Sequence, residues 1–183
     1  MTVRLSKADL KKIANGRALY EVLQKVLARD NMLDKSKEHL WVCGLDAKHY
    51  LKFIELVTLG NDYKTTADAV SIFSLALSKG CRQIILAHNH PGDILDPSEE
   101  DIQTTQGIVA IGRFLSCEVY DHLIINEDYY YSFRDCGLIK QMKRMGLKEI
   151  IGEQKVIQIL LDSYRKENET MKKELEELKK RKK

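Results

Sequence analysis

A short apolar run near the middle of the chain, Gln83–Ala87, most constrains the fold. Four consecutive apolar residues without polar alternation are typical of a strand buried on both faces of a sheet. Gly80 stands just before this run and is expected to end a helix over residues 67–77. The segment His88–Pro97 is predicted to be a loop because it is rich in Pro, Gly and Asp, and Ser98 then opens another helix. The run is therefore expected to be a buried strand of an α/β domain.

Other apolar runs predict the remaining strands of a mixed sheet, flanked by helices. They form two predicted antiparallel hairpins, His39–Leu45 with Leu51–Leu59 and Cys117–Ile125 with Tyr129–Phe133. Ahead of them, Ser6 is expected to cap an amphipathic helix or helical pair over residues 10–27, with Gly16 as a break.

The chain of 183 residues, 44% of them hydrophobic, is long enough for one domain with a real core and an appendage. We expect an N-terminal helical segment at 1–30, the main domain at 31–140 and a charged C-terminal helix at 141–183. No run approaches the roughly 20 apolar residues that span a bilayer, and no signal-peptide pattern opens the chain. A soluble, cytoplasmic protein without membrane contact is expected. The four cysteines are widely spaced, which favours reduced thiols over disulfides.

The C-terminal segment differs in kind from the main domain. Apolar and small polar residues recur there at alternating spacings of four and three: Ile157, Leu161, Tyr164, Asn168, Met171, Leu175 and Leu178. This heptad pattern predicts a coiled coil that pairs two copies of the chain, with Asn168 favouring a parallel dimer. A single helix docked on its own domain is the alternative. The basic end, residues 179–183, is interpreted as a frayed terminus, with nucleic acid or an acidic partner as the alternative.

Chemistry is concentrated where the buried strand enters its loop. His88 and His90 alternate onto one side of an extended chain, and Asp101 follows one turn into the next helix. Two imidazoles and a carboxylate form a three-ligand set suited to Zn²⁺, with a fourth position open for water. Zinc lowers the pKa of such a water from about 15.7 to about 7 and so supplies a nucleophile at neutral pH. Ser98 and Asp101 also match a helix capping box, and the two interpretations are compatible.

The segment from Ile84 to Asp101, IILAHNHPGDILDPSEED, resembles the metal-binding motif of the RadC-like JAB domains, members of the JAMM/MPN metalloprotease superfamily. Asp121–Ile125 and Tyr131–Asp135 resemble that family's C-terminal strands, so the resemblance covers roughly residues 19–137. One departure is Gly92-Asp93 where the family has Ser-Gly, although the distance to Asp101 is unchanged.

The resemblance implies roles for further residues. The family's glutamate at the start of an early strand matches Glu38 in the segment EHLWVCGLD, which makes Glu38 the expected general base. An exposed, purely structural glutamate is the alternative. Ser98 would donate a hydrogen bond to the developing oxyanion. His122 is interpreted as a structural strand histidine, with support of a metal ligand as the alternative.

The resemblance and the ligand set together predict a zinc-dependent hydrolase that cleaves a peptide or isopeptide bond in a protein substrate. A DNA-associated module in repair or mobile elements and a metal-binding scaffold without activity are the alternatives. Charge argues against autonomous DNA binding: residues 153–183 hold ten Lys/Arg and seven Asp/Glu, and residues 1–152 hold twenty of each. A balanced domain lacks the excess of cations that supplies most non-specific affinity for phosphates.

Overall fold

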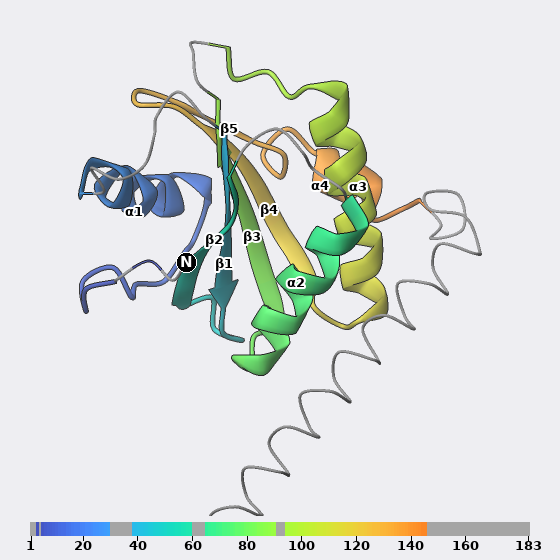
Figure 1. The fold of residues 1–183 in the computed structure, drawn as a ribbon, viewed down its shortest axis with the longest axis horizontal. Coiled ribbons are helices and arrows are strands. Elements are labelled where there is room, and N and C mark those ends of the chain that lie inside the picture. Colours follow the sequence, from blue (N-terminus) through green and yellow to red (C-terminus); the bar gives the residue numbers. More distant parts are fainter. Residues whose placement is uncertain (1–2, 4, 30–37, 60–64, 91–93, 146–183) are drawn as a thin grey trace, which may run out of the picture.

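The computed structural model describes residues 3, 5–29, 38–59, 65–90 and 94–145. They form one mixed sheet of five strands flanked by helices, so the predicted fold class is confirmed (Figure 1). The strands lie in the order β2-β1-β3-β4-β5, and only β3 and β4 run parallel. In chain order the elements are α1 Gly16–Arg29, β1 His39–Leu45, β2 Leu51–Leu59, α2 Thr65–Ser78, β3 Gln83–Asn89, α3 Glu99–Phe114, β4 Glu118–Ile125, β5 Tyr130–Ser132 and α4 Leu138–Met142.

Strand β3 is the central strand that the apolar run predicts. It pairs with β1 on one edge and with β4 on the other, and its residues from Ile84 to His88 are buried. Both predicted hairpins form, β1 with β2 and β4 with β5. Helix α2 is followed by Gly80, whose φ of 68° falls in the left-handed region that glycine adopts without steric penalty.

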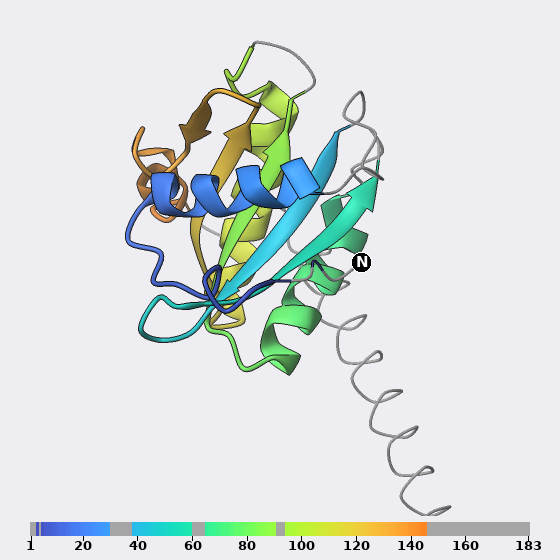
Figure 2. The same cartoon turned by 90° about the vertical axis from the view of Figure 1, so that its left-hand side faces the viewer.

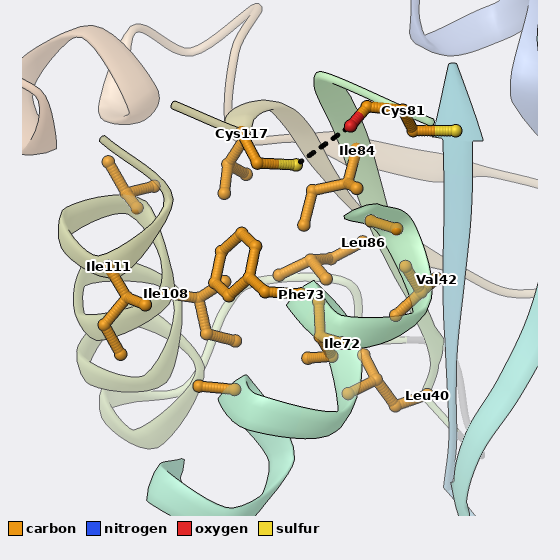
Figure 3. Close-up of a cluster of buried hydrophobic side chains, with 14 of the residues drawn as sticks. Leu40, Val42, Ile72, Phe73, Cys81, Ile84, Leu86, Ile108, Ile111 and Cys117 are labelled. Atoms are coloured by element: carbon orange, nitrogen blue, oxygen red, sulfur yellow. Dashed lines mark hydrogen bonds between the residues drawn. The ribbon is translucent and has the colours of Figure 1, made fainter. Parts of the chain in front are cut away.

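Two hydrophobic layers cover the two faces of the sheet. Alternate residues of β1 supply them: Leu40 and Val42 pack with α2 and α3, whereas Trp41 and Cys43 pack with α1. Figure 3 shows the first layer, with Phe73 of α2 between the sheet and α3. Figures 1 and 2 show α1 crossing the opposite face. Alternating burial therefore gives each face its own core.

The expected helix over residues 10–27 is correct only from Gly16 onward. Asn15 accepts a hydrogen bond from the Ala18 amide at 3.0 Å, as a helix cap does. Before it, the chain runs beside the first turn of the hairpin: the Ile13 amide donates to His49 at 2.8 Å, and the Leu51 amide to Lys11 at 3.1 Å. Ser6 therefore caps no helix. Its carbonyl accepts from the Asp9 amide at 3.0 Å in a local turn, and the Ile13 amide is bonded to His49 and not to a preceding helical turn.

The loop predicted from His88 begins two residues later, because β3 continues through Asn89 beside β1 and β4. The cysteines are free, with Cys43, Cys81 and Cys117 buried and Cys136 exposed, as expected for reduced thiols. The heptad seam and the basic end lie outside the described residues, as does the departure at Gly92-Asp93. Among the residues the structure describes, no helix is long and apolar enough to cross a membrane.

Candidate metal centre

The two histidines of the predicted ligand set sit at the carboxyl end of β3. Residues 84, 86, 88 and 90 alternate onto the face covered by α2 and α3, which brings both imidazoles to the same side. His88 is buried with 2% of its surface exposed, while His90 is half-buried. Their Nε2 atoms lie 3.0 Å apart. Spacing in an extended chain thus converts His-x-His into a convergent pair.

Asp101 approaches the pair from the first turn of α3. Ser98 is the N-cap of this helix, and its amide and hydroxyl donate to Asp101 Oδ2 at 2.8 and 2.6 Å. The other oxygen, Oδ1, lies 3.2 Å from Nε2 of His88. The capping box that the sequence predicts is therefore present, and the same geometry aims one carboxylate oxygen at the histidines.

The donor set fits a cation. His90 Nδ1 lies 2.9 Å from the carbonyl oxygen of Ile94, which can only accept, so His90 carries its proton on Nδ1 and leaves a lone pair on Nε2. Burial lowers the pKa of His88 to about 4, so that imidazole is neutral at pH 7. One ligand atom from each of His88, His90 and Asp101 lies within 4.8 Å of the others. Such converging lone pairs need a positive charge between them, either a proton or a metal ion.

Glu38 immediately precedes β1, the strand that pairs with the histidine-bearing strand β3. Leu40 pairs with His88 in the antiparallel register, and continuing that register by two residues brings Glu38 opposite His90. The His39 amide fixes this end of the strand by donating to the Asn89 side chain at 2.9 Å. Glu38 is half-buried and shares a cleft with both histidines.

This cleft has a volume of about 290 Å³ and opens between the sheet and α3. All five residues predicted from the sequence line it: Glu38, His88, His90, Ser98 and Asp101. Its apolar wall includes Leu40, Leu86 and Ile108, which belong to the core layer of Figure 3. An apolar wall with a few convergent polar groups is typical of a small-molecule or peptide site.

Ser98 is more tightly engaged than the sequence indicates. Its single hydroxyl proton points to Asp101 Oδ2, while its oxygen accepts from the Asp101 amide at 3.1 Å. In this conformation Ser98 holds the carboxylate. The oxyanion role stays a prediction, and it requires the hydroxyl to rotate toward the cleft.

Two further residues, His122 and Thr105, are connected to His88 by hydrogen bonds. The sequence left the role of His122 open and gave almost no sign of Thr105. Nε2 of His122 lies 2.8 Å from Nδ1 of His88, so the alternative of supporting a metal ligand matches the geometry. Nδ1 of His122 in turn lies 2.6 Å from the hydroxyl of Thr105. Thr105 stands one helical turn after Asp101, and that spacing was the only sequence signal available for it.

Comparison with known proteins shows the family of this chain. Residues 13–138 match the model of the RadC-like JAB domain family. A UPF0758 protein of Chloroflexus aggregans is 36% identical over 135 residues, and one of Chlorobaculum parvum is 33% identical over 137 residues. These alignments cover 74% and 75% of this chain but only 58% and 60% of the two relatives, so the chain spans less than two thirds of their length. The protein belongs to the RadC-like JAB domain family.

Proposed function

We propose that this protein is a zinc-dependent hydrolase of the JAMM type, which cleaves a peptide or isopeptide bond. The observation that carries the proposal is the convergence of Nε2 of His88, Nε2 of His90 and the Asp101 carboxylate in an open cleft. Three protein ligands with room for a fourth are the pattern of a catalytic zinc site. When bound, zinc lowers the pKa of a coordinated water and polarises a carbonyl oxygen.

The chain's own residues have separate tasks in this reaction. Glu38 accepts a proton from the attacking water and returns it to the departing amine as the C–N bond breaks, which leaves a carboxylate and an amine as products. The metal ion would be bound by three side chains, those of His88, His90 and Asp101. Ser98 keeps Asp101 in position through its two hydrogen bonds. The apolar wall at Leu40 and Ile108 excludes water from one side of the cleft.

Elemental analysis of the full chain and two variants tests this proposal. We expect about one zinc per chain in the parent and in Glu38→Gln, and little zinc in Asp101→Ala, because one of three ligands is lost. Peptides from a digested protein mixture serve as substrates, with cleavage followed by mass spectrometry. Glu38→Gln should lose on the order of 10²–10⁴ in rate, mainly in kcat.

Two outcomes contradict the proposal. A parent protein that binds zinc but cleaves no peptide bond is a metal-binding scaffold. A Glu38→Gln variant as active as the parent assigns proton transfer to another group, and Glu38 is then a structural residue.

A further inference from the structure

The strand β4 carries a histidine that contacts the metal centre from behind. His122 is buried with 2% exposure, and its ring stacks on Phe133 with 4.8 Å between centroids. Both of its ring nitrogens have partners: Nε2 meets His88 Nδ1 at 2.8 Å, and Nδ1 meets Thr105 Oγ1 at 2.6 Å. In a neutral imidazole one nitrogen donates and the other accepts, so the partners decide which does which.

Thr105 decides the direction. Its hydroxyl oxygen lies 2.6 Å from the carbonyl oxygen of Asp101 one turn earlier, and a carbonyl can only accept. The single hydroxyl proton of Thr105 is therefore used on Asp101. Toward His122 the hydroxyl must accept, which puts the proton of His122 on Nδ1 and leaves a lone pair on Nε2.

The same reasoning applies to the imidazole ring of His88. Because Nε2 of His122 accepts, Nδ1 of His88 must donate, and the remaining lone pair of His88 is on Nε2. That atom is the one directed at His90 Nε2 and Asp101 Oδ1, at 3.0 and 3.2 Å. We propose that Thr105 and His122 form a hydrogen-bond relay that fixes the tautomer and the ring orientation of His88, and thereby prepares the metal centre.

The relay joins three elements of the fold. Its hydrogen bonds run from the Asp101 carbonyl through Thr105 on α3 and His122 on β4 to His88 on β3. Nε2 of His88 then lies 3.2 Å from the Asp101 carboxylate, where a cation bound between the two atoms would complete the ring. Figure 1 shows β3 and β4 side by side with α3 packed along them. Residues behind metal-bound histidines orient the ring and raise its basicity, and they are usually carboxylates, carbonyls or waters. Here a neutral imidazole occupies that place, and both relay residues are positioning residues.

The relay deepens the proposed function, and its first test needs no metal. In metal-free, full-length protein labelled with ¹⁵N-histidine, two-bond ¹H–¹⁵N correlation spectra report which nitrogen of each ring carries the proton. We expect Nδ1–H for both His88 and His122. Thr105→Val removes the acceptor and should change the tautomer population of His122, whereas Thr105→Ser should preserve it. A parent protein in which Nδ1 of His88 carries no proton overturns the relay, whether or not the protein binds zinc.

Zinc affinity, measured by competition with a chelator, is the second test. His122→Phe should bind zinc 10–100-fold more weakly than the parent, which is the usual effect of losing such a partner. His122→Gln should recover part of the loss, because its side-chain oxygen can accept from His88. His39→Phe is the matched control, since His39 is equally buried and stacks on Trp41 in the opposite layer. Affinity unchanged in His122→Phe contradicts the relay, whereas a parent that binds no zinc contradicts only the proposed function.

Discussion

Two aspartates on opposite sides of the sheet accept similar hydrogen bonds but differ in whether one carboxylate oxygen stays available. Asp101 accepts the hydroxyl of Ser98, and Asp121 accepts the hydroxyl of Ser132 at 2.8 Å. Each also accepts backbone amides: Asp101 from Ser98, and Asp121 from His122 and Arg134 at 2.7 and 2.9 Å. The first lines the cleft, whereas the second has 1% of its surface exposed.

The difference lies in the second oxygen of each carboxylate. Both oxygens of Asp121 are engaged by protein donors, so this residue joins β4 to β5 and the turn that follows. Asp101 places both Ser98 bonds on Oδ2 and directs Oδ1 at His88. A serine–aspartate pair therefore leaves a carboxylate oxygen that could bind a metal ion when one oxygen remains available, and is a structural junction when none does.

The largest effect on stability is expected at the junction. Asp121→Ala leaves the buried His122 amide, the buried Ser132 hydroxyl and the part-buried Arg134 amide without an acceptor, at up to about 1–3 kcal/mol for each buried group. The variant also no longer has to bury a carboxylate, which offsets part of this loss. We therefore expect the free energy of unfolding to fall by about 2–4 kcal/mol. Urea denaturation at pH 7 measures the loss. Asp101→Ala should lose about 1 kcal/mol, and equal losses in the two variants contradict the comparison.

A smaller effect concerns pH. Burial raises the pKa of Asp121 to about 6, against the partial compensation of its hydrogen bonds. Because the folded state holds this proton more tightly than the unfolded chain, the contribution of Asp121 to stability falls as pH rises from about 4 to about 6. Asp121→Asn cannot ionise, so its stability relative to the parent should increase over that range. Thermal denaturation of both proteins at pH 4, 5, 6 and 7 measures it, and a constant difference contradicts the prediction.

The smallest effect is expected at the pair formed by the exposed Ser98 and the half-buried Asp101. Ser98→Ala removes the cap of α3 and one bond to Asp101 Oδ2, and should reduce the free energy of unfolding by about 1 kcal/mol. Zinc affinity should fall as well, because the carboxylate loses a constraint. Ser98→Thr keeps the hydroxyl and serves as the control. If Ser98→Ala changes stability but leaves zinc affinity untouched, the pair is only a helix cap.

The sequence by itself determined the strands of the sheet and the clustering of His88, His90 and Asp101. Alternating and continuous apolar runs predicted every strand of the sheet, because burial on one or both faces leaves a readable pattern. His-x-His at a strand end and Asp101 after a capping serine predicted a convergent ligand set, because both spacings act within one strand or one helical turn. The division into three segments and the coiled coil over the C-terminal residues stay predictions.

Only the tertiary structure decided which residues hydrogen-bond to the predicted ligand His88 from within the fold. His122 is 34 residues from His88, and Thr105 is 17 residues from His122, so no local spacing joins them. They meet because β3 and β4 pair in parallel and α3, the crossover between them, packs back onto both. The segment before Gly16 was predicted wrongly for a similar reason, since its helical pattern was overridden by hydrogen bonds to residues 49–54. Local periodicity records which face is buried, whereas hydrogen-bond partners distant in sequence exist only once the sheet is assembled.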